Sequence, residues 1–203
     1  MMGFPTVISF YTMQTPYEEE VKNLVASCDK FGLEHKIEGV PSFGTWELNC
    51  AYKPFFIYKM VNELKRPVLW VDADGVFKKA PSLIDAFESD VAVRINPACP
   101  EDDPSKVISS TIFINSTQEA ALLLRAWMQE SSRQILDENR TEEFWDQIAL
   151  RDALKLPGHQ AKVKSLPTSY AKIFDHPEDF FFFQEPVIEH YQASRRFKNL
   201  ING

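Results

Sequence analysis

Residues 68–71 (Val-Leu-Trp-Val) are uniformly apolar, and two acidic residues, Asp72 and Asp74, follow almost at once. A strand that faces water on one side alternates apolar and polar side chains, whereas a parallel strand covered on both faces is apolar throughout. Pro67 ends the helical pattern before the stretch, because proline lacks the backbone N–H that a helix needs. This order predicts an α/β fold in which residues 68–71 lie at the centre of a mostly parallel sheet flanked by helices.

Two strand–helix units precede this central strand. Residues 6–12 are β-branched and aromatic, and residues 33–40 predict a second strand. Helical patterns occupy residues 15–32 and residues 51–64. The first begins with a capping-box pattern, Thr-Pro-Tyr-Glu, and ends at a glycine that suits a C-cap. The first half of the chain therefore predicts the order strand, helix, strand, helix, strand.

The second half of the chain carries shorter elements and no internal repeat. A Pro- and Asp-rich loop at residues 96–104 separates two expected strands, and a second capping-box pattern begins at Ser116. A chain of 203 residues can bury one substantial core but is short for two, so we expect a single domain over residues 1–203. The expected elements are helices near 81–87, from 117 onward and at 141–154, and strands at 91–95, 107–114 and near 163–166.

Charge and composition exclude several classes of function. The formal net charge is −7, whereas broad binding to nucleic-acid backbone relies on Lys and Arg that displace counterions. The longest apolar runs fall far short of the roughly 20 residues that span a bilayer. The first residues lack the basic and apolar regions of a secretion signal, and Cys28, Cys50 and Cys99 are widely spaced. We expect reduced thiols, no nucleic-acid partner, no transmembrane segment and a cytoplasmic protein.

Asp72 and Asp74 lie at the carboxyl end of the predicted central strand. Open α/β sheets bind ligands outside the carboxyl ends of their strands. Two carboxylates at this spacing can converge on one hard cation, which in turn neutralises a diphosphate. The alternative is that Asp-Ala-Asp-Gly is only an acidic turn, since short motifs recur by chance.

The end of the chain supplies further candidates. His190 follows another short apolar run, residues 186–188, and could give a nitrogen ligand to the same cation, although a lone histidine is more often structural. Arg195, Arg196 and Lys198 form the only dense basic cluster of an acidic chain. Such a cluster suits a diphosphate, and the alternative is a solvated basic face.

The strand–helix order, residues 68–74 and residues 187–190 (Val-Ile-Glu-His) together resemble the GT-A-fold nucleotide-diphospho-sugar transferases, including the glycogenin and bacterial galactosyltransferase-like groups. The resemblance implies a Rossmann-like GT-A sandwich over nearly the whole chain. It also implies a hexosyltransferase-like glycosyltransferase that uses a nucleoside-diphosphate sugar, most commonly a UDP-sugar, and a divalent metal, Mn²⁺ or Mg²⁺. The acceptor would be a glycan, a lipid-linked glycan or a protein.

By position, the resemblance assigns roles to individual residues. Asp72 and Asp74 match the family's DxD motif, whose acids bind the metal and the ribose or diphosphate of the donor, and His190 matches its late metal-binding histidine. Asp146 and Gln147 resemble an Asp-Gln pair that faces the donor sugar, which makes them the catalytic candidates. Helical phasing places Asp146 at the edge of an apolar face, so exposure to solvent is an equal alternative. The other implied donor contacts are Phe10, Tyr11, Thr12, Lys53, Asn115, Arg195 and Arg196.

The sequence departs from the family's pattern near its end. Related groups often carry His-x-x-Gly-x-x-Lys-Pro-Trp, and this chain has Ala193, Arg196, Phe197 and Lys198 at the last four marked positions. Arg196 keeps the positive charge of the lysine. The missing Gly and Pro-Trp weaken assignment to that particular group.

Two other functions remain open. A strand followed by Asp-Ala-Asp-Gly also opens the haloacid-dehalogenase-like phosphatases, in which Asp72 would be the nucleophile and Asp74 the general acid and base. That motif normally lies on the first strand, whereas here two strand–helix units precede it. The second alternative is a non-catalytic nucleotide-sugar-binding module whose aromatic run, residues 180–183, docks a partner. The donor, the acceptor, the stereochemistry and the oligomeric state stay open.

Overall fold

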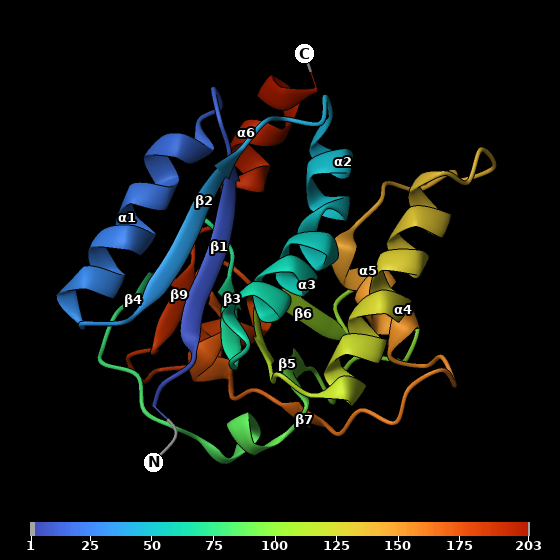
Figure 1. Ribbon diagram of the computed structural model, residues 1–203. Helices are drawn as coiled ribbons and strands as arrows, with labels where there is room; N and C mark the ends of the chain where they lie inside the picture. Colours follow the sequence, from blue (N-terminus) through green and yellow to red (C-terminus); the bar gives the residue numbers. More distant parts are fainter. Residues whose placement is uncertain (1–2, 203) are drawn as a thin grey trace.

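The computed structural model describes residues 3–202, which form an α/β fold around a six-stranded sheet (Figure 1). The strand order is β2-β1-β3-β6-β5-β7. The expected single domain also includes residues 1, 2 and 203, which lie outside the described part of the chain. The strands of this sheet are β1 Thr6–Thr12, β2 His35–Val40, β3 Val68–Val71, β5 Val91–Ile95, β6 Val107–Ile114 and β7 Val163–Ser165.

β3 lies inside the sheet, as its uninterrupted apolar sequence predicts. Leu69 packs into a core with Leu24 of α1, and Trp70 packs into a second core with Phe56 of α3. Consecutive β3 side chains therefore enter opposite cores, and helices cover both faces of the sheet (Figure 1). Folding therefore removes the apolar surface of both faces of the sheet from contact with water. The helices are α1 Tyr17–Lys30, α2 Trp46–Ala51, α3 Lys53–Leu64, α4 Gln118–Ile135, α5 Asp146–Ala153 and α6 Ser194–Ile201.

The sheet is mostly parallel, which confirms the predicted fold class. β1 runs parallel to β2 and β3, and β5 runs parallel to β7. β6 is the exception, because it runs antiparallel to both of its neighbours. Thr111 pairs with Val71 at the end of β3, and Ile114 pairs with Val68 at its start. The first half of β6 therefore lies beside the acidic turn after β3, and the end of β6 lies away from it.

A small second sheet brings the end of the chain back to the acidic turn. Its order is β4-β9-β8, with β4 at Gly75–Phe77, β8 at Lys172–Ile173 and β9 at Ile188–His190. β9 pairs antiparallel with β4, and Gly75 lies opposite His190. This pairing places His190 next to a motif that is far away in the sequence.

The structure corrects the expected start of the first helix. α1 begins at Tyr17, and its N-cap residue, Pro16, provides no side-chain cap. The Thr15 hydroxyl donates to the Thr12 carbonyl at 2.7 Å and also accepts from the backbone N–H of Tyr17 at 3.3 Å. The expected cap at Thr15 is therefore present, whereas the reciprocal bond from Glu18 that would complete a capping box is not formed among the described residues.

Other helix ends also differ from expectation. The helix expected at residues 51–64 is α3, which begins at Lys53, and a short helix that was not expected, α2, precedes it and meets it at Tyr52. The helix expected at residues 141–154 begins only at Asp146, and the one expected at residues 81–87 is a single 3₁₀ turn at Asp85–Glu88. Within residues 3–202, no helix is long and apolar enough to cross a bilayer.

Candidate active site

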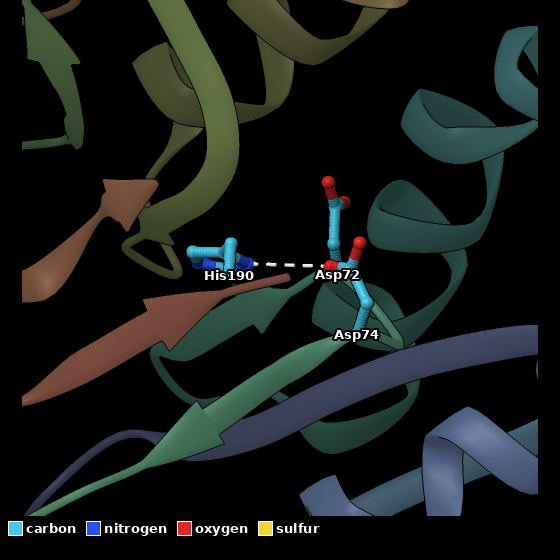
Figure 2. Close-up of side chains that lie close together, drawn as sticks. All are labelled: Asp72, Asp74 and His190. Carbon is cyan, nitrogen blue, oxygen red and sulfur yellow. Dashed lines mark ion pairs between the residues drawn. The ribbon is translucent and has the colours of Figure 1, made fainter. Parts of the chain in front are cut away.

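Asp72, Asp74 and His190 converge at the carboxyl end of β3 (Figure 2). One possible ligand atom from each residue lies within 4.8 Å of the other two. Asp72 and Asp74 come from the turn between β3 and β4, and His190 ends β9. His190 Nδ1 lies 3.5 Å from Asp74 Oδ1. The three residues that sequence reasoning assigned to one cation are therefore neighbours.

Hydrogen bonds fix the orientation of this cluster. His190 Nε2 lies 2.8 Å from the hydroxyl of Thr111 on β6, and both side chains are fully buried. Asp74 Oδ2 accepts a bond of 2.7 Å from the backbone N–H of Ala193. A metal-binding histidine typically has its second nitrogen fixed by such a partner. The remaining atoms, His190 Nδ1 and Asp74 Oδ1, face each other.

Those two facing atoms are buried and have no hydrogen-bond partner. Buried polar atoms in folded proteins nearly always have a partner, and each exception needs an explanation. A cation between Asp74 Oδ1 and His190 Nδ1 would satisfy both atoms at once. The residues present therefore fit a divalent metal site.

The charges around the cluster act on its carboxyl groups in opposite ways. Burial opposes ionisation of Asp74, but the nearby His190 imidazole, together with the Ala193 N–H, holds the Asp74 pKa below its usual value. Burial raises the pKa of Asp72, and Lys53 only partly offsets this effect. A bound cation would favour the charged form of both groups.

Lys53 joins the acidic turn to the start of α5. Its ammonium lies 2.9 Å from Asp72 Oδ1 and 2.6 Å from Asp146 Oδ2. Ser109 donates to the same Asp146 oxygen at 2.7 Å, and Trp70 donates to Asp72 Oδ1 at 2.8 Å. Burial opposes the charge on Lys53, but Asp146 and Asp72 outweigh it and hold the Lys53 pKa above its usual value. The contacts on Asp72 use Oδ1, which leaves Oδ2 available to a cation.

The acidic turn opens onto a cleft of about 740 Å³. The cleft runs over the carboxyl end of β1, the acidic turn, the start of α5 and the start of α6. Most of the residues that sequence reasoning assigned to the donor line it. These are Phe10, Tyr11, Thr12, Lys53, Asp72, Asp74, Asp146, Gln147 and Arg195.

Two assigned residues lie elsewhere. Asn115 follows β6 at the opposite end of the sheet from the acidic turn, and its side-chain amide donates to the Ser89 carbonyl at 3.2 Å. Asn115 lies at that end because β6 runs antiparallel to β3, so that β6 finishes beside the start of β3. Arg196 forms an ion pair of 2.7 Å with Glu20 and does not line the cleft. Arg195 does line it and pairs with Asp175.

Sequence reasoning missed several residues of the cleft. Ser109 and Ser110 belong to β6, and both are buried. Two serines and a threonine within an otherwise apolar buried strand are a signal for a site, because buried polar side chains need partners. Trp46 and Trp145 also line the cleft, and nothing in the sequence distinguishes them from core aromatic residues.

Gly75 is expected to be irreplaceable in this arrangement. A Cβ at this position would lie 2.5 Å from Val71 Cγ1, 2.9 Å from His190 Cε1 and 3.1 Å from the Asp72 carbonyl oxygen. We predict that Gly75→Ala lowers the free energy of unfolding by about 1–3 kcal/mol and displaces His190 from Asp74. Urea unfolding measures the first effect and Mn²⁺ binding the second. Gly158→Ala is the matched control, since its Cβ would meet nothing within 4 Å; equal effects of both changes would contradict the prediction.

No family model and no curated protein sequence matches the chain, but several solved structures do. A glycosyltransferase involved in the glycosylation of the major capsid of PBCV-1 matches with a TM-score of 0.64 and 12% identity, over 98% of this chain and 98% of that chain. The glycosyltransferase GlyE of Streptococcus pneumoniae TIGR4 matches with a TM-score of 0.59 and 16% identity, over 93% of this chain and 55% of that chain. At such low identities the likeness concerns the fold. The chain has a GT-A-like glycosyltransferase fold.

Proposed function

We propose that this protein is a metal-dependent glycosyltransferase that transfers a sugar from a nucleoside-diphosphate sugar, with a UDP-sugar as the first donor to test. The observation that carries the proposal is the pair of buried, unpartnered atoms, Asp74 Oδ1 and His190 Nδ1, beside a large cleft. The cleft lies at the carboxyl end of the central strand, where α/β folds bind their ligands. The fold is one that glycosyltransferases use.

Asp72, Asp74 and His190 are the residues that would hold the metal. When bound, a divalent cation neutralises the negative charge that develops on the departing diphosphate. Two carboxylates and one imidazole suit Mn²⁺ better than Mg²⁺, since magnesium prefers oxygen ligands alone. Thr111 and the Ala193 N–H hold two of these side chains in place.

The chain's other residues would bind and orient the donor. Phe10, Tyr11 and Thr12 line the cleft at the end of β1, where the nucleoside would lie. Arg195 lines the cleft at the start of α6 and would bind the diphosphate by its fork of N–H donors. The acceptor hydroxyl oxygen would bond to the anomeric carbon, the bond from that carbon to the diphosphate would break, and the hydroxyl proton would pass to the departing diphosphate or to water.

Asp146 would stabilise positive charge on the reacting sugar. Its Oδ2 already accepts from Lys53 and Ser109, so we assign it an electrostatic role and not that of the base. A preorganised carboxylate costs no reorganisation at the moment of reaction. Gln147 lines the same wall, and its amide donates to the Pro104 carbonyl at 2.8 Å.

The proposal is tested by donor turnover. The protein is incubated with UDP-, GDP- and CDP-sugars, with and without Mn²⁺, and the released nucleoside diphosphate is measured by chromatography. We expect release from donors of one base, only with metal, and none from Asp74→Asn. Phosphate release from p-nitrophenyl phosphate with Mg²⁺, without any nucleotide release, would instead support the phosphatase. Nucleotide binding without release, even with acceptors added, would support the binding module.

A further inference from the structure

The start of α5 forms one side of the cleft, and of its residues Asp146 and Gln147 are assigned to the donor sugar whereas Trp145 is not. Trp145 and Gln147 line this side, and Ile173 at the end of β8 and Pro177 after it line the same cleft. Trp145 directly precedes Asp146, whose carboxylate is joined through Lys53 to Asp72. This side of the cleft is therefore next to the place where the sugar would react.

Each Lys and Arg side chain that lines the cleft, among the described residues, is paired with a carboxylate. Lys198 lines the cleft and forms an ion pair with Glu143, and its ammonium also lies 5.0 Å from the centre of the Trp46 ring. Among the described residues, the other Lys and Arg side chains of the cleft are Lys53 and Arg195, and each of them has a carboxylate partner. Since Arg195 is assigned to the donor diphosphate and Lys53 is held by two carboxylates, an acceptor phosphate would have to displace Glu143 from Lys198.

Trp145 is the exposed aromatic surface of this side. Its side chain is 40% exposed, and its Nε1 donates to Glu143 Oε2 at 3.0 Å. No other ring and no cation stacks on it among the described residues. The single hydrogen bond limits rotation of the indole, while its face stays open. A large exposed aromatic side chain in a cleft marks a contact surface for a ligand.

We propose that the acceptor is a neutral sugar whose C–H face stacks on Trp145. This inference rests on the proposed function and names its acceptor class. A pyranose has an apolar face of C–H groups and a rim of hydroxyls, and the electron-rich face of an indole attracts such C–H groups. The Gln147 amide nitrogen is already bound to the Pro104 carbonyl, which leaves its oxygen to accept from a sugar hydroxyl. A phosphate-bearing acceptor would have to compete with carboxylates for the described Lys and Arg side chains of the cleft.

The test is saturation-transfer NMR with methyl glycosides of glucose, galactose, mannose and N-acetylglucosamine, in the presence of Mg²⁺ and the nucleoside diphosphate that binds. We expect saturation transfer from the wild type to the C–H protons of at least one glycoside. Trp145→Ala should weaken its apparent affinity about tenfold or more, as for a truncated Trp at the centre of an interface. Trp145→Phe keeps an aromatic face and should retain most of the affinity. Leu136→Ala is the control, because Leu136 is 76% exposed at the end of α4.

The outcomes separate this inference from the proposed function. If nucleoside diphosphate and metal bind but no glycoside shows saturation transfer, the neutral-sugar acceptor is wrong and the transferase survives. Glycoside binding that is unchanged in Trp145→Ala also overturns the inference. If glycosides bind through Trp145 while no nucleoside diphosphate binds, the sugar site stands and the proposed function fails. Retained nucleotide binding in Trp145→Ala shows that the variant is folded.

Discussion

Replacing Lys53 with methionine is expected to lower the free energy of unfolding by about 3–5 kcal/mol, because removing one partner of a buried ion pair leaves uncompensated charge. The Lys53 side chain is 7% exposed, and it is held by Asp72 and Asp146, which are 32% and 12% exposed. Methionine has a similar length and no charge. For a chain of this size the loss corresponds to a fall of about 6–20 °C in melting temperature. Urea unfolding measures the free energy of unfolding, and a thermal melt measures the melting temperature.

Lys59→Met is the matched control on the same helix. Lys59 pairs with Glu38 at 2.9 Å, but its side chain is 45% exposed, and exposed pairs contribute about 1 kcal/mol or less. Adding Asp146→Asn to Lys53→Met should recover part of the lost stability, since one of the two unpaired carboxylates is then neutral. Equal losses of unfolding free energy for Lys53→Met and Lys59→Met would show that the buried network contributes no more to stability than an exposed ion pair.

Replacing Asp74 with asparagine is expected to weaken Mn²⁺ binding about 100-fold or more, because a change that only supports a metal ligand already costs about 10–100-fold. Asparagine keeps an oxygen to accept the Ala193 N–H but removes the negative charge that faces His190. Electron paramagnetic resonance counts free Mn²⁺ directly and needs neither donor nor acceptor. The fold of the variant is checked by its melting temperature without metal.

Asp102→Asn is the control for this change, because Asp102 is an exposed acid in the loop before β6. It removes one unit of negative charge from the chain, as Asp74→Asn does, so a general electrostatic effect would appear in both variants. Weak Mn²⁺ binding in the wild type that both substitutions reduce equally would contradict a specific metal site.

The central strand and its acidic end could be predicted from the sequence. Four consecutive apolar residues at 68–71 have one simple explanation, burial on both faces of a sheet, and the structure confirms it. Asp72 and Asp74 then lie at the ligand-binding edge because a parallel strand ends there. The signal is local, so it needs no knowledge of distant contacts.

The partners of that strand could not be predicted in the same way. The direction of β6 is set by pairing with β3 and β5, and a strand carries no local mark of whether it runs parallel or antiparallel. This reversal separates Asn115 from the cleft and brings Ser109 into it. β8 has only two residues, which is too few for an alternation of apolar and polar side chains to indicate a strand. The metal assignment of His190 rested on its residue type after a short apolar run and on a resemblance, whereas its place beside Asp74 depends on β4–β9 pairing.

The most direct test of the central claim is calorimetric titration of the protein with UDP, GDP and CDP, each with and without Mn²⁺. The account predicts that one nucleoside diphosphate binds, that binding requires the metal, and that Asp74→Asn abolishes it. Binding of a nucleoside diphosphate that is equally tight without metal, or no binding of any of the three with Mn²⁺ present, would contradict it.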